Sequence, residues 1–166
     1  MPSERTKKIK WAHSALAIIA TVVVLTIIFI AINSQKTYTS LVVGNQTLQV
    51  EIANTSQKRQ QGLCCRDSLP ADQGMLFVYD KPGDYRFWMK DTRIPLDMIW
   101  IGSNKHIVHI EHSVAPESYP QTFSSPEPAQ YILETNAGYA KKHGLKKSDN
   151  VAFSLSTVDS LKLLLP

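Results

Sequence analysis

The sequence GMLFVYDKPGDYRFWMKDTRIPLDMIWI, residues 74–101, carries the strongest strand and turn signals of the chain. Its apolar run at residues 75–79 predicts a strand. Residues 81–84, Lys-Pro-Gly-Asp, predict a hairpin turn because proline fixes φ, glycine permits positive φ and aspartate can cap the turn. Residues 85–89 are expected to return as a second strand. Pro95 has no N–H to donate to a sheet, so the chain must bend at residues 91–95 before a third strand at residues 96–101.

The predicted return strand has two different faces, since side chains alternate across a strand. The face expected in the core carries Tyr85, Phe87 and Met89, and the opposite face carries Arg86, Trp88 and Lys90. One side of this strand can therefore enter a core while the other presents two cations and an indole ring together.

Motifs in and around this stretch resemble the family known as domain of unknown function 192. They are Gly62, Leu63 and Arg66, then Leu69, residues 74–77, the FWMK-x-T-x-IPLD segment at residues 87–97, and residues 133–138. The resemblance covers about residues 46–154 and implies a small, mainly β domain, often exported or membrane-tethered. It supplies no established reaction. The chain departs from the expected pattern at Cys64-Cys65, where a methionine or similar apolar residue is expected.

The charge of the chain is unevenly distributed. Its formal net charge is +4, but Arg5, Lys7, Lys8 and Lys10 precede the first apolar segment and only Glu4 opposes them. The remainder is close to neutral. A nucleic-acid-binding domain needs a basic stripe to neutralise phosphates, so we predict no nucleic-acid partner.

The segment from Trp11 to Ile32 is apolar over about the 20 residues that a bilayer-spanning helix needs. We favour an uncleaved anchor over a signal peptide, whose apolar region is shorter and ends at a small-x-small site. The basic residues before it predict a cytoplasmic N-terminus. The expected organisation is a basic N-terminus at residues 1–10, a transmembrane anchor at 11–32, a linker at 33–40 and an extracytoplasmic β domain at 41–166, placing the protein in a cell membrane as a single-pass protein.

The remaining segments predict short strands separated by turn signals. The expected strands are residues 41–43, 47–53, 130–135 and 149–156, with helices at 57–61, ended by Gly62, and at 137–143, capped by Asn136. Residues 113–129 are proline-rich and predict a long irregular loop. This pattern indicates a mainly β domain with two short helices, built as a partly open antiparallel barrel or a two-sheet sandwich.

Two residue types invite a redox or metal interpretation. Cys64 and Cys65 are adjacent, and a bond between them would close a small, strained ring. We therefore favour cysteines that replace apolar residues in a buried corner, with a disulfide as the alternative. The three histidines of residues 105–112 cannot converge from a regular strand, although His109 with Glu111 could bind a metal with help from elsewhere. No metal site and no cofactor are predicted.

The polar residues within the family-like motifs are the candidate ligand-binding residues: Arg66, Trp88, Lys90, Asp97 and Glu134. In a structural interpretation, Arg66 pairs with Asp97 or Glu134 while Trp88 packs over the bridge. In a functional one, these groups line a pocket with Trp88 as an apolar or sugar-stacking platform. No nucleophile, cofactor cradle or metal-ligand set accompanies them. We therefore predict a non-catalytic domain that binds a small molecule, glycan or protein partner in the cell envelope, with an enzyme using an Asp97/Glu134 carboxylate pair as the alternative.

Overall fold

The computed structural model describes residues 18–26 and 38–155, which fall into two compact units divided between Lys36 and Thr37. In the first unit, residues 18–26 form a helix with exposed aliphatic side chains. Most of the predicted span from Trp11 to Ile32 lies outside the described residues. Within the described ranges, no helix has both the length and the apolar character needed to cross a membrane.

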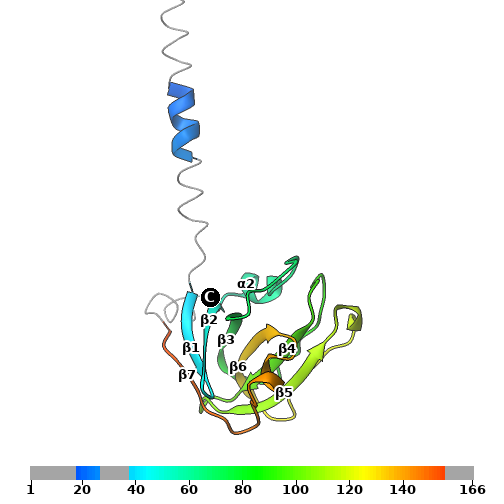
Figure 1. Cartoon of the computed structure of the whole chain (residues 1–166). Helices are drawn as coiled ribbons and strands as arrows, with labels where there is room; N and C mark the ends of the chain where they lie inside the picture. The colour runs from blue at the N-terminus through cyan, green and yellow to red at the C-terminus, as the bar shows by residue number, and fades with distance from the viewer. Residues whose placement is uncertain (1–17, 27–37, 156–166) are drawn as a thin grey trace, which may run out of the picture. The chain divides into compact units, whose positions relative to one another are not determined.

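The second unit is a mainly β domain, as the sequence predicts (Figure 1). Its strands are β1 (Tyr38–Val43), β2 (Gln46–Ala53), β3 (Gln73–Gly83), β4 (Leu96–Ile101), β5 (Ile107–Val114), β6 (Ala129–Asn136) and β7 (Val151–Phe153). They form one sheet in the order β5-β4-β6-β3-β2-β1-β7. The β2–β3 pair is parallel and the other pairs are antiparallel.

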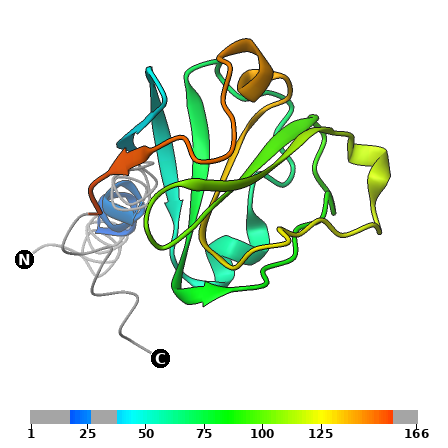
Figure 2. The same cartoon turned by 90° about the horizontal axis from the view of Figure 1, so that it is seen from below.

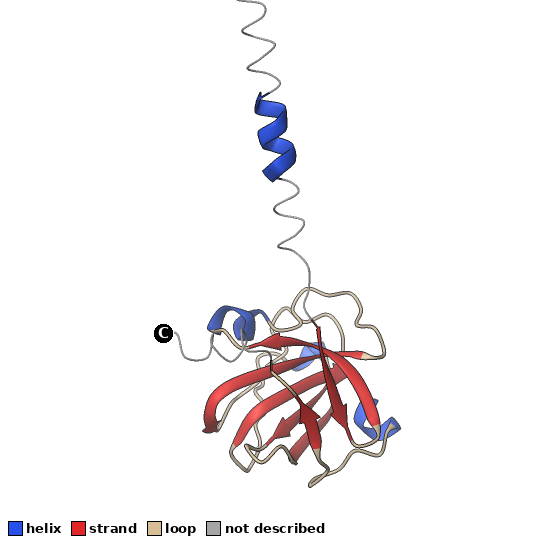
Figure 3. Ribbon diagram, turned by 90° about the vertical axis from the view of Figure 1, so that its left-hand side faces the viewer, coloured by secondary structure: helices blue, strands red, loops and turns tan. Residues whose placement is uncertain are grey.

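The sheet curls into a partly open barrel, which Figure 2 shows from below and Figure 3 from another side. An isolated bridge between His106 and Asn150 joins the start of β5 to the start of β7, so the two edge strands approach each other. Of the two predicted architectures, the partly open barrel is therefore confirmed. The two-sheet sandwich is wrong, because the seven strands form a single sheet.

The core consists of two clusters, one on each face of the sheet. The first contains residues from all seven strands, which places it inside the curl. The second covers the outer face of β3, β4 and β6, where Phe77, Trp100 and Ile132 pack against Phe87 and Met89 of the segment before β4. Strand β4 is buried on both faces, which explains its nearly continuous apolar sequence.

The predicted hairpin at residues 81–84 does not form. Strand β3 continues to Gly83, and residues 85–89 do not pair back onto it. Both edges of β3 are already occupied, by β2 and β6, so no hydrogen-bonding edge remains for the return strand. Instead, Phe87 forms an isolated bridge with Phe123 of the proline-rich loop. The predicted alternation of faces is nevertheless present, since Phe87 and Met89 are buried and Trp88 is exposed.

The first predicted helix is confirmed as α2 (Ser56–Gln61), which Thr55 caps and Gly62 ends with φ of 53°. The proline-rich loop contains a single short helix of its own, η1 (Pro116–Ser118). The helix after β6 is shorter than predicted: α3 (Tyr139–Lys142) has Gly138 at its N-cap position.

The predicted N-cap role of Asn136 is wrong. Asn136 is the last residue of β6, and its side-chain amide donates hydrogen bonds to the carbonyls of Leu69 and Pro70. Asn136 therefore holds the segment before β3 against the end of β6. The N–H groups of Gly138 and Ala140, at the start of α3, donate to a different side chain.

Candidate functional site

The carboxylate of Asp97 accepts the hydrogen bonds from the start of α3. Asp97 is fully buried, and its oxygens accept hydrogen bonds from the backbone N–H groups of Ser113 (2.8 Å), Gly138 (3.0 Å) and Ala140 (2.8 Å). These bonds fix the end of β5 and the start of α3 to β4. Both oxygens of this carboxylate accept hydrogen bonds from the backbone, so Asp97 has a structural role in the fold.

Arg66 has a different partner from either of those predicted. Its two terminal nitrogens donate to the two carboxylate oxygens of Glu51, at 2.6 and 2.8 Å. Both side chains are mostly shielded, with 20% and 14% of their surfaces exposed. The hydrogen bond to Glu51 is the main reason that the pKa of Arg66 is raised. The expected pairing of Arg66 with Asp97 or Glu134 is therefore wrong, and the bridge ties the segment after α2 to β2.

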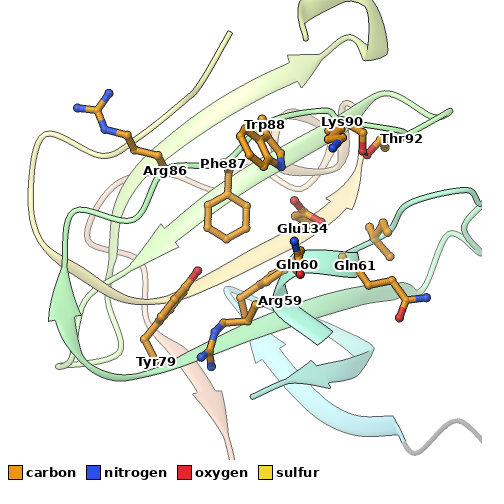
Figure 4. A pocket seen from close by; sticks show the side chains of 13 residues that line it. Arg59, Gln60, Gln61, Tyr79, Arg86, Phe87, Trp88, Lys90, Thr92 and Glu134 are labelled. Atoms are coloured by element: carbon orange, nitrogen blue, oxygen red, sulfur yellow. The ribbon is translucent and has the colours of Figure 1, made fainter. Parts of the chain in front are cut away.

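A pocket of about 70 Å³ opens on the outer face of the sheet (Figure 4). Helix α2, the segment at residues 84–95 and strands β3 and β6 supply its walls. Its polar and aromatic lining residues include Arg59, Tyr79, Arg86, Trp88, Lys90 and Glu134. Residues 84–95, part of which was predicted to be a strand, thus form one wall. Side chains alternate along this segment, so Phe87 lies in the core while Arg86, Trp88 and Lys90 line the opening.

Glu134 lies at the base of this pocket (Figure 4). On the sheet it lies directly between Met75 of β3 and Met98 of β4, its register partners, and only 4% of its surface is exposed. None of the described residues donates a hydrogen bond to its carboxyl. Burial raises the pKa of Glu134 to about 8, against the lowering effect of the Arg66 charge. At neutral pH this carboxyl therefore retains its proton.

Cationic and aromatic side chains surround the opening. Arg59 donates to the carbonyl of Val78 (3.0 Å), and its guanidinium lies over the Tyr79 ring, 4.8 Å from the centroid. Burial raises the pKa of Tyr79 to about 12, so its hydroxyl stays neutral. Trp88 is 51% exposed and makes an edge-to-face contact with Tyr119 of the proline-rich loop.

Cys64 and Cys65 form a disulfide next to the pocket. The expectation of cysteines in a buried corner is therefore wrong: Cys64 is half-buried and Cys65 is exposed. The N–H of Cys65 donates to the carbonyl of Asp91 at 2.9 Å. This bond links the end of the α2 segment to the turn that carries Lys90, so the two walls of the pocket are tied together at this corner.

Metal-binding groups are not assembled in the described part of the chain. No cluster of three or more His, Cys, Asp or Glu side chains there could hold an ion. His109 and Glu111 do face each other, with 3.5 Å between the imidazole Nε2 and a carboxylate oxygen.

Comparison with known proteins identifies the family. A family model described as DUF192, an uncharacterized ACR, matches residues 39–153. The chain belongs to the DUF192 family. The matched range covers the curled sheet except for Tyr38, the first residue of β1, and all the lining residues of the pocket. No curated protein matches the chain.

Two solved structures are similar to this DUF192 chain. A "putative transcription regulator" from Sinorhizobium meliloti 1021 is 32% identical, with a TM-score of 0.68, over 72% of this chain and 95% of its own. A protein of unknown function from Novosphingobium aromaticivorans DSM 12444 is 29% identical, with a TM-score of 0.67, over 69% of this chain and 84% of its own. Both share the fold of the β domain.

The DUF192 motif residues separate into two groups in the structure. Trp88, Lys90 and Glu134 meet at the pocket, whereas Arg66 and Asp97 are absent from its described lining. Sequence reasoning missed Arg59 and Tyr79. The sequence held little signal for either, since Arg59 belongs to a short polar helix and Tyr79 ends an apolar strand.

Proposed function

We propose that this DUF192 domain is a non-catalytic binding domain that takes a small polar ligand in the pocket above Glu134. The observation that carries the proposal is the Glu134 carboxyl, which is buried, faces the pocket and has no hydrogen-bond donor among the described residues. The carboxyl lines a pocket that is open to the surface, so a ligand that enters the pocket can hydrogen-bond to it.

The positions of the two motif carboxylates favour binding over catalysis. Asp97 is in register with Thr135, and Glu134 with Met98, so Asp97 and Glu134 point to opposite faces of the sheet. The oxygens of Asp97 are also occupied by backbone N–H groups. An acid–base pair acting on one substrate needs both groups within reach of it, and this arrangement separates them.

The size of the pocket bounds the ligand. A volume of about 70 Å³ is several times the space that one water needs. It suits a small molecule, or the terminal group of a longer ligand such as a glycan or a protein partner. The exposed Trp88 at the rim supplies an apolar platform for the part of the ligand outside the pocket.

We further propose that Trp11 to Ile32 anchors the domain on the outer side of a cell membrane. The apolar length of this segment and the basic residues before it support the proposal, and the Cys64–Cys65 disulfide is typical of an oxidising compartment. A cysteine introduced at Ser40, with Cys64 and Cys65 replaced by serine, tests the orientation. Labelling of intact cells by a membrane-impermeant reagent is expected, and labelling only after lysis would contradict the proposal.

The binding function is tested by screening the full chain against metabolites, glycans and peptidoglycan fragments by thermal shift. A ligand of this pocket should stabilise the wild type and lose most of that effect in Trp88→Ala. Glu127→Gln is the matched control, because Glu127 is exposed, pairs with Lys147 and lies outside the pocket. Ligands whose effect survives Trp88→Ala bind elsewhere and would refute the assignment of the site.

A further inference from the structure

We infer that the ligand of this pocket is an anion, a small carboxylate whose charged end hydrogen-bonds to the Glu134 carboxyl and whose apolar part lies against Trp88. This inference rests on the proposed binding function and specifies its ligand class. Three features of the pocket support it: the cationic side chains of its walls, the aromatic rings that already contact other side chains, and the Glu134 carboxyl at its base.

The charges that line the pocket favour an anion. Arg59, Arg86 and Lys90 bring three cations to the lining, and Glu134 is the only carboxylate among the described lining residues. Among the described residues, Arg86 pairs with Asp84 at a long distance of 3.6 Å, and both side chains are largely exposed. Arg59 is held in place by the Val78 carbonyl. A partly enclosed site lined by one sign of charge concentrates ligands of the opposite sign.

The aromatic side chains do not form a cage for a cation. Such a cage needs free ring faces, to which a cationic ligand is attracted. The Tyr79 ring has the Arg59 guanidinium on it and is also stacked on Tyr85, with 3.5 Å between centroids. Phe87 is buried against Phe77. Trp88 alone remains as an exposed platform, which suits an apolar group rather than a positive charge next to Lys90.

The Glu134 carboxyl at the base of the pocket also suits an anion, because a carboxylic acid can donate a hydrogen bond to a carboxylate. Two ionised carboxylates cannot lie in contact, so one proton must be shared between ligand and Glu134. On the neighbouring strands, the register partners of Glu134 are the uncharged Met75 and Met98. On the other elements, Arg66 and Tyr79 interact electrostatically with this carboxyl, and Arg59, Arg86 and Lys90 line the same pocket.

This arrangement predicts a pH dependence of known sign. The carboxyl titrates at about 8 and holds the required proton below that pH. Above it, the proton must be taken up from solution when the anion binds. The affinity for an anion should therefore fall about tenfold per pH unit above pH 8. A ligand that donates a hydrogen bond, or an ammonium ion, should bind more tightly as the pH rises through the same range.

The test uses four probes of equal length: propionate, propionamide, 1-propanol and propylammonium. Each is titrated into the full chain at pH 7 and pH 9, at low ionic strength, and binding is followed by the NMR signals of the Trp88 indole. We expect propionate to bind most tightly at pH 7 and about tenfold more weakly at pH 9. Glu134→Gln should retain propionate binding, since its amide still donates, and lose the pH dependence.

Matched variants distinguish the loss of a positive charge in the pocket from the loss of one elsewhere on the surface. Lys90→Gln should weaken propionate more than propionamide, whereas Lys141→Gln, on the exposed side of α3, should leave both unchanged. Glu127→Gln should keep the pH dependence of the wild type. Tighter binding of propylammonium or 1-propanol, or propionate affinity that rises with pH, would overturn the anion and leave the binding function intact. Failure of all four probes to bind would overturn both.

Discussion

Replacing Glu134 by glutamine should remove a pH dependence of stability that this one carboxyl imposes on the domain. The pKa of Glu134 is about 8 in the folded state, against 4.5 for an ordinary glutamate. Below pH 4.5 both states hold the proton. Between 4.5 and 8 the unfolded state releases it while the folded state retains it, so the free energy of unfolding falls as the pH rises. Above pH 8 the loss is complete.

The size of this loss follows from the two pKa values. The interval between them, at about 1.4 kcal/mol per pH unit, corresponds to a loss on the order of 5 kcal/mol across the range. Glutamine has nearly the same shape and no titration in this range. Glu134→Gln should therefore match the wild type at pH 4 and exceed its stability progressively up to pH 8, by an amount that approaches this value.

The assay is urea denaturation of the full chain at intervals from pH 4 to pH 9, with tryptophan fluorescence as the signal. Only the difference between variant and wild type is interpreted, because other titrating groups contribute equally to both. Glu127→Gln should show no such pH-dependent difference. A constant difference between Glu134→Gln and the wild type would refute the reasoning, since it would mean that the carboxyl titrates normally in the folded domain.

The other structural assignments lead to three further predictions. Asp97→Asn should cost about 3 kcal/mol, because its amide group would face backbone N–H donors, and should leave propionate affinity unchanged; lost affinity at unchanged melting temperature would contradict this. Removing Arg66 or Glu51 alone should cost about 2–3 kcal/mol, and a double-mutant cycle should give a coupling above about 1 kcal/mol; additive effects would contradict the bridge. Intact-mass analysis should show alkylation of Cys64 and Cys65 only after reduction, and alkylation without reductant would contradict the disulfide.

Local sequence patterns predicted much of the fold because the relevant interactions are local. The alternation in β2 and the cap and glycine that bound α2 depend on neighbouring residues. The apolar run of β4 is also a direct consequence of burial on both faces. The hairpin failed for the opposite reason. Which strands flank β3 depends on β2 and β6, and β6 lies about 50 residues further along the chain, so the turn residues at 81–84 could not decide the pairing.

The candidate site was only partly predictable for the same physical reason. Alternation along the segment places Trp88 and Lys90 on one face, and the sequence motif identified both as candidate ligand-binding residues. Neither the partner of Arg66 nor the donors to Asp97 could be read from sequence. Glu51 of β2 meets Arg66, 15 residues further along in the segment after α2, and Ala140 reaches Asp97 across 43 residues of chain. Polar residues of one motif thus have separate roles that only the folded arrangement distinguishes.

NMR titration of the side-chain carboxyl carbon of Glu134 measures the protonation of this group without an intermediate step. The full chain, labelled with ¹³C at the glutamate carboxyl, is titrated from pH 3 to pH 10, and the Glu134 signal is assigned by its absence in Glu134→Gln. We predict a midpoint near 8 for this signal, well above the ordinary value of 4.5. A Glu134 midpoint near 4.5 would refute the buried, protonated carboxyl, because the pocket would then hold an ionised carboxylate and could not take an anion beside it.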